Sequence, residues 1–304
     1  MNEMPLAEHP HEAASEAPRV IAPARDSIFA ERALRFAALA EGHALGDWLR
    51  FLGRLTQAQH QALLALPALP LPDAAARERA MPPLPARHWP RDAAWKQALR
   101  TILGAASIDA AEMARHCCAA LEAATDERLE ALAERVLRAE LGGADAALLP
   151  FVAAALQVYW TALAAGFGAD NIPALDVHGI CPCCGSLPVA SIVRVAPETN
   201  GRRYLHCSLC NTEWNLVRVK CTACDGTGKI AYRQIEGSGL RNAEAMRAET
   251  CDECKSYLKI LYQAKAPDGD PVADDLATLA LDLLVDEAGY SRAGPNLLFV
   301  PGAS

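Results

Sequence analysis

The sequence predicts an α+β multidomain protein: an all-α N-terminal domain, two tandem four-cysteine ribbon modules, and a C-terminal helix. Three observations support this prediction. Ala and Leu carry the hydrophobicity of a chain that is 52% apolar but only 6% aromatic. Helical periodicity continues to about residue 172, and nine of the eleven cysteines follow it. The 304 residues are enough for two or three domains with a buried core.

The helical domain is expected over residues 26–172. Asp26 or Ser27 is the expected cap of a helix that begins at Ile28, and Asp47 the cap of a second. Seven prolines between residues 67 and 90 exclude a continuous helix and indicate a connector. Residues 1–25, rich in Pro, Glu, Ala and His, are expected to form a disordered tail. Four further helices are expected over 92–105, 107–122, 126–141 and 146–165.

The composition changes after Pro173, because Ala becomes scarce and β-branched and aromatic residues become more frequent. This change indicates short strands bounded by turns. They are expected within 187–195, 202–207, 214–220, 229–236 and 256–263. A single helix is then expected from Val272 to Ala288, within a C-terminal segment of residues 267–304.

Four C-x2-C pairs carry the chemistry of this region. A C-x2-C turn holds two thiolates on one side of a tight loop, so two turns supply four sulfurs at tetrahedral corners. In chain order, the first two pairs enclose 22 residues and the last two enclose 26, which leaves room for a hairpin in each. We therefore expect ribbons at 173–215 and 216–266, each with one mononuclear metal ion. The expected ligands are Cys181, Cys184, Cys207, Cys210, Cys221, Cys224, Cys251 and Cys254.

The residue after each pair is expected to adopt positive φ. Gly185, Asn211 and Asp225 tolerate that conformation, whereas Lys255 suits it less. Four thiolates suit zinc and mononuclear iron equally, so the sequence leaves the metal open. Disulfides and thioredoxin-like redox pairs are disfavoured, since no strand-turn-helix context surrounds the pairs and the chain carries no readable export signal.

Other cysteines and histidines are not expected to bind metal. Cys183 lies between two ligands and should point away from the ion, which leaves its role open. His178 and His206 lie outside the turns and are expected near the ligands or on the surface. The consecutive residues 116–118, His-Cys-Cys, diverge by about 100° on a helix and are expected to pack in the core. No catalytic motif is present, so no catalytic residue is nominated.

Charge and hydropathy limit the classes of partner. The net charge of −8 disfavours general nucleic-acid binding. The uncharged stretch 146–169 contains Pro150, Gln157 and Thr161 and is flanked by acidic residues, so we expect a buried helix and no integral membrane segment. The first 25 residues lack a basic start followed by an apolar stretch, and a cytoplasmic location is therefore expected.

The combined pattern resembles the formate dehydrogenase accessory protein family, FdhE. The resemblance rests on the Ala-rich helical half, on four C-x2-C turns including Cys-Pro-Cys-Cys-Gly at 181–185, and on Asp-Asp-Leu-Ala-Thr-Leu-Ala-Leu-Asp-Leu-Leu at 274–284, followed by Ala-Gly-Tyr and Gly-Pro-Asn. It implies a cytoplasmic factor with rubredoxin-like metal sites. Such a factor contacts the catalytic subunit of a respiratory molybdenum formate dehydrogenase before export and is needed for its activity, without oxidising formate itself.

Two other functions stay open at this stage. An iron-thiolate electron carrier or redox enzyme would cycle a four-cysteine iron between two oxidation states. A nucleic-acid-binding zinc ribbon would show strongly salt-dependent binding, although the cysteine-rich region is about neutral once its metals are counted. The step of maturation (sulfur transfer, cofactor delivery or a folding check) and the presence of a homo-oligomer also stay open. Cys→Ser at Cys181 or Cys251 is expected to remove one metal equivalent and to destabilise mainly its own ribbon.

Overall fold

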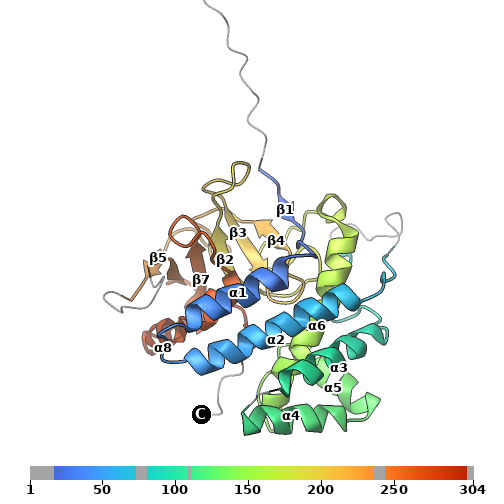
Figure 1. Ribbon diagram of the computed structural model, residues 1–304. Coiled ribbons are helices and arrows are strands. Elements are labelled where there is room, and N and C mark those ends of the chain that lie inside the picture. Colours follow the sequence, from blue (N-terminus) through green and yellow to red (C-terminus); the bar gives the residue numbers. More distant parts are fainter. Residues whose placement is uncertain (1–16, 73–80, 109–110, 236–243, 300–304) are drawn as a thin grey trace, which may run out of the picture.

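The structure is a computed structural model that describes residues 17–72, 81–108, 111–235 and 244–299. The helical half and the sheet lie side by side, with α1 between α2 and the strands (Figure 1). The predicted fold class is confirmed: helices come first, then a sheet region with two four-cysteine clusters, then C-terminal helices. The helices of the first half are α1 (Ile28–Ala40), α2 (Gly46–Ala65), α3 (Ala94–Ala106), α4 (Glu112–Glu122), α5 (Asp126–Leu137) and α6 (Leu149–Phe167).

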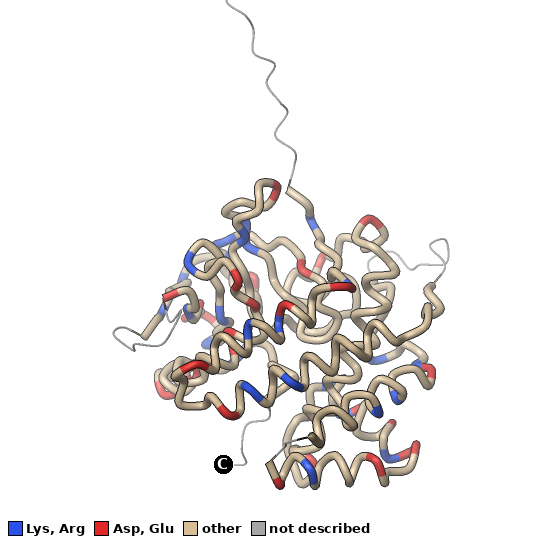
Figure 2. The backbone as a smooth tube through the Cα atoms, viewed as in Figure 1, with Lys and Arg blue, Asp and Glu red and all other residues tan. Residues whose placement is uncertain are grey.

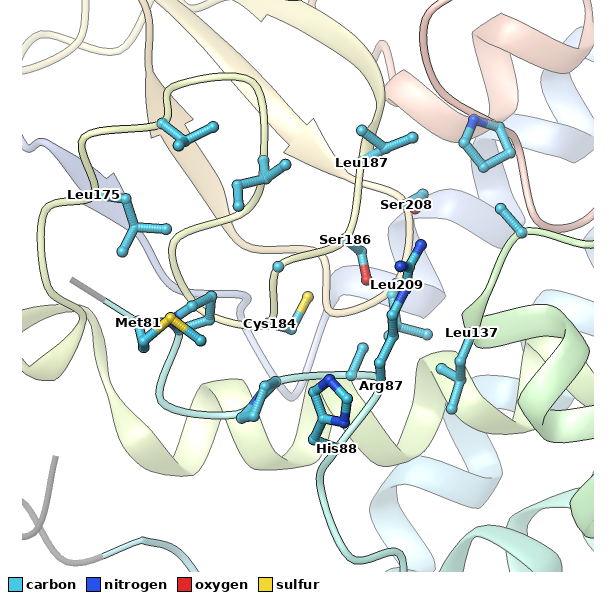
Figure 3. A pocket seen from close by; sticks show the side chains of 18 of the residues that line it. Met81, Arg87, His88, Leu137, Leu175, Cys184, Ser186, Leu187, Ser208 and Leu209 are labelled. Atoms are coloured by element: carbon cyan, nitrogen blue, oxygen red, sulfur yellow. The ribbon is translucent and has the colours of Figure 1, made fainter. Parts of the chain in front are cut away.

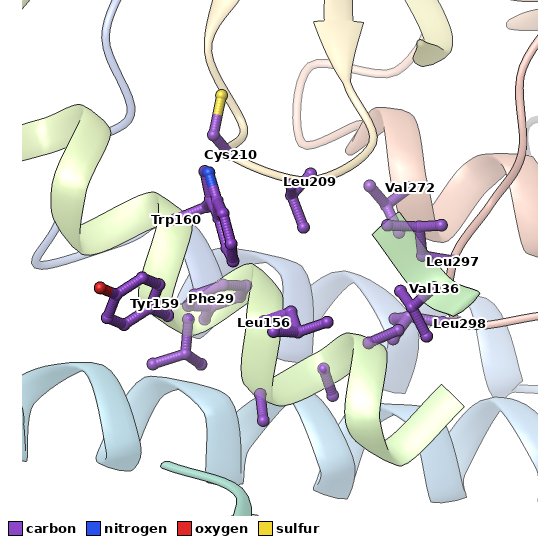
Figure 4. Close-up of a cluster of buried hydrophobic side chains, with 14 of the residues drawn as sticks. Phe29, Val136, Leu156, Tyr159, Trp160, Leu209, Cys210, Val272, Leu297 and Leu298 are labelled. Atoms are coloured by element: carbon purple, nitrogen blue, oxygen red, sulfur yellow. The ribbon is translucent and has the colours of Figure 1, made fainter. Parts of the chain in front are cut away.

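Helix α6 is the centre of the helical half. It packs against α2, α3 and α5, and nearly all its side chains are buried. Figure 4 shows Leu156, Tyr159 and Trp160 of this helix inside the core. Within the part of the chain that the structure describes, the helical segment Ala146–Phe167 is long and apolar enough to span a membrane. However, 78% of its most apolar 18 residues are buried within the protein. The helix is therefore a core helix, as the sequence predicts.

The two cysteine-rich ribbons share one sheet. Its strand order is β1-β4-β3-β2-β7-β6-β5, and β8 pairs with β7. The first ribbon joins the second through a parallel pairing of β2 with β7, in which Ser191 lies opposite Ile260. The strands are β1 (Val20–Ile21), β2 (Pro188–Val193), β3 (Arg203–Cys207), β4 (Glu213–Asn215), β5 (Ile230–Arg233), β6 (Met246–Cys251), β7 (Ser256–Tyr262) and β8 (Ser291–Arg292).

Several strands differ from the sequence prediction, which did not include the two-residue strand β8. β4 is shorter than predicted, and Val217 and Val219 beyond it are exposed. β6 was not predicted, because its sequence Met-Arg-Ala-Glu-Thr-Cys carries three polar residues. β1 lies within the segment expected to be disordered, and its residues pair with Trp214 and Glu213 of β4. Pairing between segments so far apart leaves no pattern in the local sequence, so the composition of residues 1–25 alone predicts a disordered tail.

The C-terminal helix is two helices, α7 (Pro271–Leu276) and α8 (Leu279–Glu287), and not the single helix predicted. The break has a physical cause. The buried Lys259 Nζ donates to the backbone carbonyls of Asp275 (2.7 Å) and Thr278 (3.1 Å), which therefore turn toward the ammonium group. This interaction could not be read from the local sequence, which is apolar enough to continue as one helix.

Helix starts were also only partly predicted. Ser27 precedes α1, but its side chain makes no cap hydrogen bond, and Asp47 lies inside the first turn of α2. Among the described residues, the side chains of Thr125 and Asp270 cap α5 and α7 by hydrogen bonds to backbone N–H groups. Asp270 precedes a proline at the first helical position, a recognised signature of a helix start.

Candidate metal centres

Each C-x2-C pair forms a tight turn that aims two sulfurs to one side. In three of the turns the backbone N–H of the next residue donates back to the first cysteine: Gly185 to Cys181 O (2.8 Å), Asp225 to Cys221 O (3.1 Å) and Lys255 to Cys251 O (2.9 Å). The four residues after the turns have φ between 55° and 76°, as the spacing predicts. Lys255 also adopts positive φ, at 55°, although a residue with a long side chain is less common in this conformation.

The turns come together in chain order. In the described part of the chain, two groups of thiols could hold a metal ion, and in each group all four sulfurs lie within 4.8 Å of one another. The first cluster is Cys181, Cys184, Cys207 and Cys210. The second cluster is Cys221, Cys224, Cys251 and Cys254. All eleven cysteines are free thiols.

The spacing of the sulfurs fits a tetrahedral ion. Metal–sulfur bonds of about 2.3 Å place the sulfurs of a tetrahedral site about 3.8 Å apart. In the first cluster Cys181 and Cys210 are 3.6 Å apart, and Cys184 and Cys207 are 3.5 Å apart. The corresponding distances in the second cluster are 3.7 and 3.8 Å. Both clusters therefore match the donor set and size that zinc or mononuclear iron requires.

The first cluster is buried between the helices and the sheet. Its four cysteines are at most 1% exposed. The proline-rich connector covers one side, where Leu84 and Ala86 donate their N–H groups to Cys183 O (3.0 Å) and Cys184 O (2.9 Å). Figure 4 shows Trp160 of α6 directly beside Cys210, and its indole N–H donates to Leu84 O (3.2 Å).

Polar groups from both turns support the sulfurs of the first cluster. The backbone N–H groups of Leu209 and Cys210 each point at Cys207 Sγ (3.4 Å). As a thiol, Cys210 donates to Thr212 Oγ1 (3.2 Å); once Cys210 is a thiolate, the hydroxyl is the group of this pair that carries a proton to donate. Burial, followed by hydrogen bonds with the neighbouring thiols, raises the pKa of Cys181 well above its ordinary value. A bound cation would remove this obstacle to ionisation, since thiolates are the metal ligands.

The second cluster lies at the surface. Cys221 and Cys251 are buried, whereas Cys224 and Cys254 are exposed. Ser256 supports this cluster as Thr212 supports the first, with its Oγ 2.9 Å from Cys254 Sγ. Burial opposes ionisation of Cys254, but the Ser256 hydroxyl and amide, together with the neighbouring thiols, lower its pKa to about 7.

Comparisons with known proteins agree along nearly the whole chain. Three family models match the chain one after another: FdhE, N-terminal, over residues 17–175; FdhE, central domain, over 180–218; and FdhE, C-terminal domain, over 219–299. The FdhE homolog of Stutzerimonas stutzeri is 41% identical over 95% of both chains. The chain belongs to the FdhE family. An FdhE protein of Escherichia coli is 36% identical over 94% of this chain and 92% of the relative.

A solved FdhE structure extends the similarity to the fold. The crystal structure of the FdhE protein from Pseudomonas aeruginosa superposes with a TM-score of 0.84 at 38% identity. The match covers 94% of this chain and all of that one. The helical half and the joined ribbons are therefore shared with a solved member of the FdhE family.

Cys183 lies beside the first cluster without being one of its four expected ligands. It is fully buried, and its orientation away from the ion stays a prediction. A hydrogen bond with Cys210, followed by burial, raises the pKa of its thiol well above the ordinary value, although a hydrogen bond with Thr212 opposes the shift. The connector covers this residue, since the Leu84 N–H donates to Cys183 O (3.0 Å). Its thiol is therefore inaccessible to external reagents.

The two histidines near the cysteine turns, His206 and His178, lie in different environments. His206 is buried, with Nδ1 2.9 Å from Glu213 Oε1 and Nε2 3.1 Å from Asn211 Oδ1. His178 is half exposed and lies 3.6 Å from Asp225. Neither belongs to the cysteine clusters. His116 is exposed on α4, so its expected core position is wrong, whereas the adjacent Cys117 and Cys118 are buried as expected.

A buried arginine that sequence analysis did not single out ties the first cluster to both ends of the chain. Arg32 of α1 is 0% exposed and pairs with Asp270 at the start of α7 (3.0 Å). It also donates to Asn211 Oδ1 (2.9 Å), directly after Cys210, and the Asn211 amide donates to Thr161 of α6 (2.8 Å). On the sequence, Arg32 looks like any surface residue of an amphipathic helix.

An apolar pocket of about 410 Å³ lies beside the first cluster (Figure 3). Met81 and the connector form one wall, Cys184 and Leu187 another, and Leu209 a third. Arg87 and His88 give it a polar side. Val177 and Met81, which also line it, are 59% and 51% exposed, so the pocket opens to solvent.

The described surface carries charges of both signs. Figure 2 shows Lys and Arg interleaved with Asp and Glu in the helices and in the strands. Several are paired, for example Lys96 with Asp126 and Lys255 with Asp252. This mixture, together with the net charge of −8, does not resemble the continuous basic face of a nucleic-acid-binding ribbon.

Proposed function

We propose that this protein is an accessory factor of a respiratory molybdenum formate dehydrogenase, needed for that enzyme's activity. It would act in the cytoplasm, where it binds the catalytic subunit before export. The observation that carries this proposal is the match to all three FdhE family models, in order, across residues 17–299.

We also propose that the eight paired cysteines hold two mononuclear ions, iron or zinc, with a mainly structural or redox-sensing role. The donor sets support this proposal, because four sulfurs complete a tetrahedral site. A closed site offers no position for substrate, so the protein itself would not be an enzyme. The ions would stabilise the turns and the sheet that the helices pack against.

Co-purification from the native organism is the direct test. The tagged full chain should retain the catalytic subunit of formate dehydrogenase, and deletion of its gene should abolish formate dehydrogenase activity. The catalytic subunit of an unrelated exported molybdoenzyme is the matched bait control. Failure to retain the dehydrogenase subunit, together with undiminished activity in the deletion strain, would reject the proposal.

One observation favours a second candidate, an iron-thiolate electron carrier. Cys224 and Cys254 bring the second cluster to the surface, where an electron could reach a bound iron from a partner. Visible absorption that bleaches with dithionite and returns with air, accompanied by electron transfer to formate dehydrogenase, would support this candidate. A colourless zinc protein that is fully functional would reject it.

A further inference from the structure

The two clusters differ in their access to solvent. All four sulfurs of the first cluster belong to buried residues, and these residues are part of the main hydrophobic core. Two of the four ligating residues of the second cluster are exposed, Cys224 and Cys254, one from each of its turns. We propose that the second cluster exchanges its metal with external thiols or chelators while the first cluster retains its own. This inference rests on the proposed metal sites and adds a metal-exchange activity to them.

The first cluster is held closed by the helical half. Besides the two N–H groups of the connector, Gln157 of α6 donates to Ser208 O (2.8 Å) within the second turn. Asn211 at the end of that turn donates to Thr161 (2.8 Å). Cys184 lines the pocket of Figure 3 but is only 1% exposed, so an incoming ligand in that pocket still needs α6 or the connector to separate from the turns before it reaches the sulfurs. Such an opening breaks several buried hydrogen bonds and exposes apolar surface.

The second cluster needs no such opening. Cys254 lies three residues after the end of β6, and Cys224 is the last residue of its own turn. Both residues are exposed to solvent. An incoming thiolate or chelator can form its bond to the ion as the bond from Cys254 or Cys224 breaks. The released sulfur then takes a proton from solvent. The exchange transfers no electron, so it requires no oxidant or reductant.

The positions of the clusters add to this difference. The first lies under α6, whereas the second lies in the ribbon of β5, β6 and β7, whose strand β5 has mostly exposed residues. Each cluster also has one cysteine beside a hydroxyl group. Cys254, beside Ser256, is exposed to solvent, whereas Cys210, beside Thr212, is buried. Both clusters have a hydroxyl near a ligand, so solvent access is the main structural difference between them.

Zinc release from the full chain tests the proposal. Protein loaded with two zinc ions is mixed with excess EDTA, and bound zinc is followed by sampling. We expect one equivalent to leave quickly and the second at least about tenfold more slowly, equal to about 1.4 kcal/mol of opening free energy. Trp160→Phe, which removes the hydrogen bond to Leu84, should speed only the slow phase. Release of both equivalents in one phase would overturn the proposal.

Alkylation of the wild-type chain assigns the phases without a variant that must fold. N-ethylmaleimide is added after the first equivalent has left, and peptides are identified by mass spectrometry. Label should appear on the second cluster, with Cys224 and Cys254 first, and Cys117 serves as a buried control thiol. First labelling of Cys181 or Cys207 would contradict the assignment. Co-purification with formate dehydrogenase is measured separately, so its outcome distinguishes failure of exchange from failure of the proposed function.

Discussion

Two hydroxyls occupy equivalent positions at the scale of single residues. Thr212 and Ser256 each follow the last cysteine of a cluster by two positions and lie 3.2 and 2.9 Å from that cysteine's sulfur. A hydroxyl that donates to a thiolate spreads its negative charge and stabilises the ligated form. The sequence contains this pattern, Cys-Asn-Thr and Cys-Lys-Ser, but sequence analysis did not single it out.

Removing the buried hydroxyl should weaken the first cluster. Thr212→Val keeps the shape of the side chain and removes the donor, so we expect the unfolding free energy to fall by about 1.5–3 kcal/mol, as for hydrogen bonds to charged groups. Denaturant unfolding of the metal-bound protein measures this loss. Thr199→Val is the matched control, because its hydroxyl donates to a backbone carbonyl of a turn, Ala196 O. An equal loss in both variants would count against a special role for Thr212.

Glu213 supplies a prediction about pH. Burial opposes ionisation of its carboxyl, but the Arg194 guanidinium and a hydrogen bond from His206 lower its pKa to about 2. A depressed folded-state pKa contributes stability above the unfolded pKa of about 4.3, and the contribution is lost as pH falls toward 2. Glu213→Gln should therefore cost about 3 kcal/mol at pH 7.

The pH profile separates this electrostatic effect from simple packing. Unfolding free energies of wild type and Glu213→Gln should converge between pH 4.3 and about 2. Metal loss in acid affects both proteins, so their difference is the informative quantity. A difference that stays constant from pH 7 to pH 2 would show that the charge of Glu213 does not provide the stability.

At the scale of elements, the cysteine turns were predictable and the C-terminal helices were not. Gly185 and Asn211 follow turns whose backbone is fixed by the local C-x2-C sequence and its positive φ. The break between α7 and α8 depends instead on Lys259, which is distant in sequence and fully buried. A local pattern cannot show which carbonyls a distant ammonium group will attract.

Lys259 should therefore be essential for the C-terminal helices. Its Nζ also contacts the carboxylates of Asp275 and Asp282. Lys259→Met leaves these two carboxylates with a single cation, Arg292, so one negative charge is uncompensated and the change should cost about 3–5 kcal/mol. Thermal or urea unfolding gives the value. Lys265→Met removes a half-exposed lysine paired with the exposed Glu244 and should cost less than about 1 kcal/mol. Similar losses in both variants would contradict this account.

At the scale of the whole molecule, sequence analysis predicted the order of helices and ribbons but not how they join. The predicted boundaries at residues 172, 215 and 266 remain a proposal about domains. The parallel pairing of β2 with β7 merges the ribbons, and Arg32 and Trp160 attach the first cluster to the helices. These contacts connect segments far apart in the chain, which periodicity and spacing do not report.

The joined architecture changes the expectation for cysteine variants. Cys181→Ser should lower hydrogen-exchange protection in α6 as well as in its ribbon, because the first cluster is part of the helical core. Cys251→Ser should affect β5, β6 and β7 and leave α6 protected. Hydrogen-exchange mass spectrometry compares the two directly. Unchanged α6 protection in Cys181→Ser would show that the helical half is independent of the first cluster.

The central claim is that four paired turns close around two metal ions. Native mass spectrometry of the full chain, isolated without chelators, tests it most directly. We predict a mass that corresponds to two ions and no disulfide, and one ion in each of Cys181→Ser and Cys251→Ser. A metal-free native chain, or two ions retained in either variant, would contradict the claim.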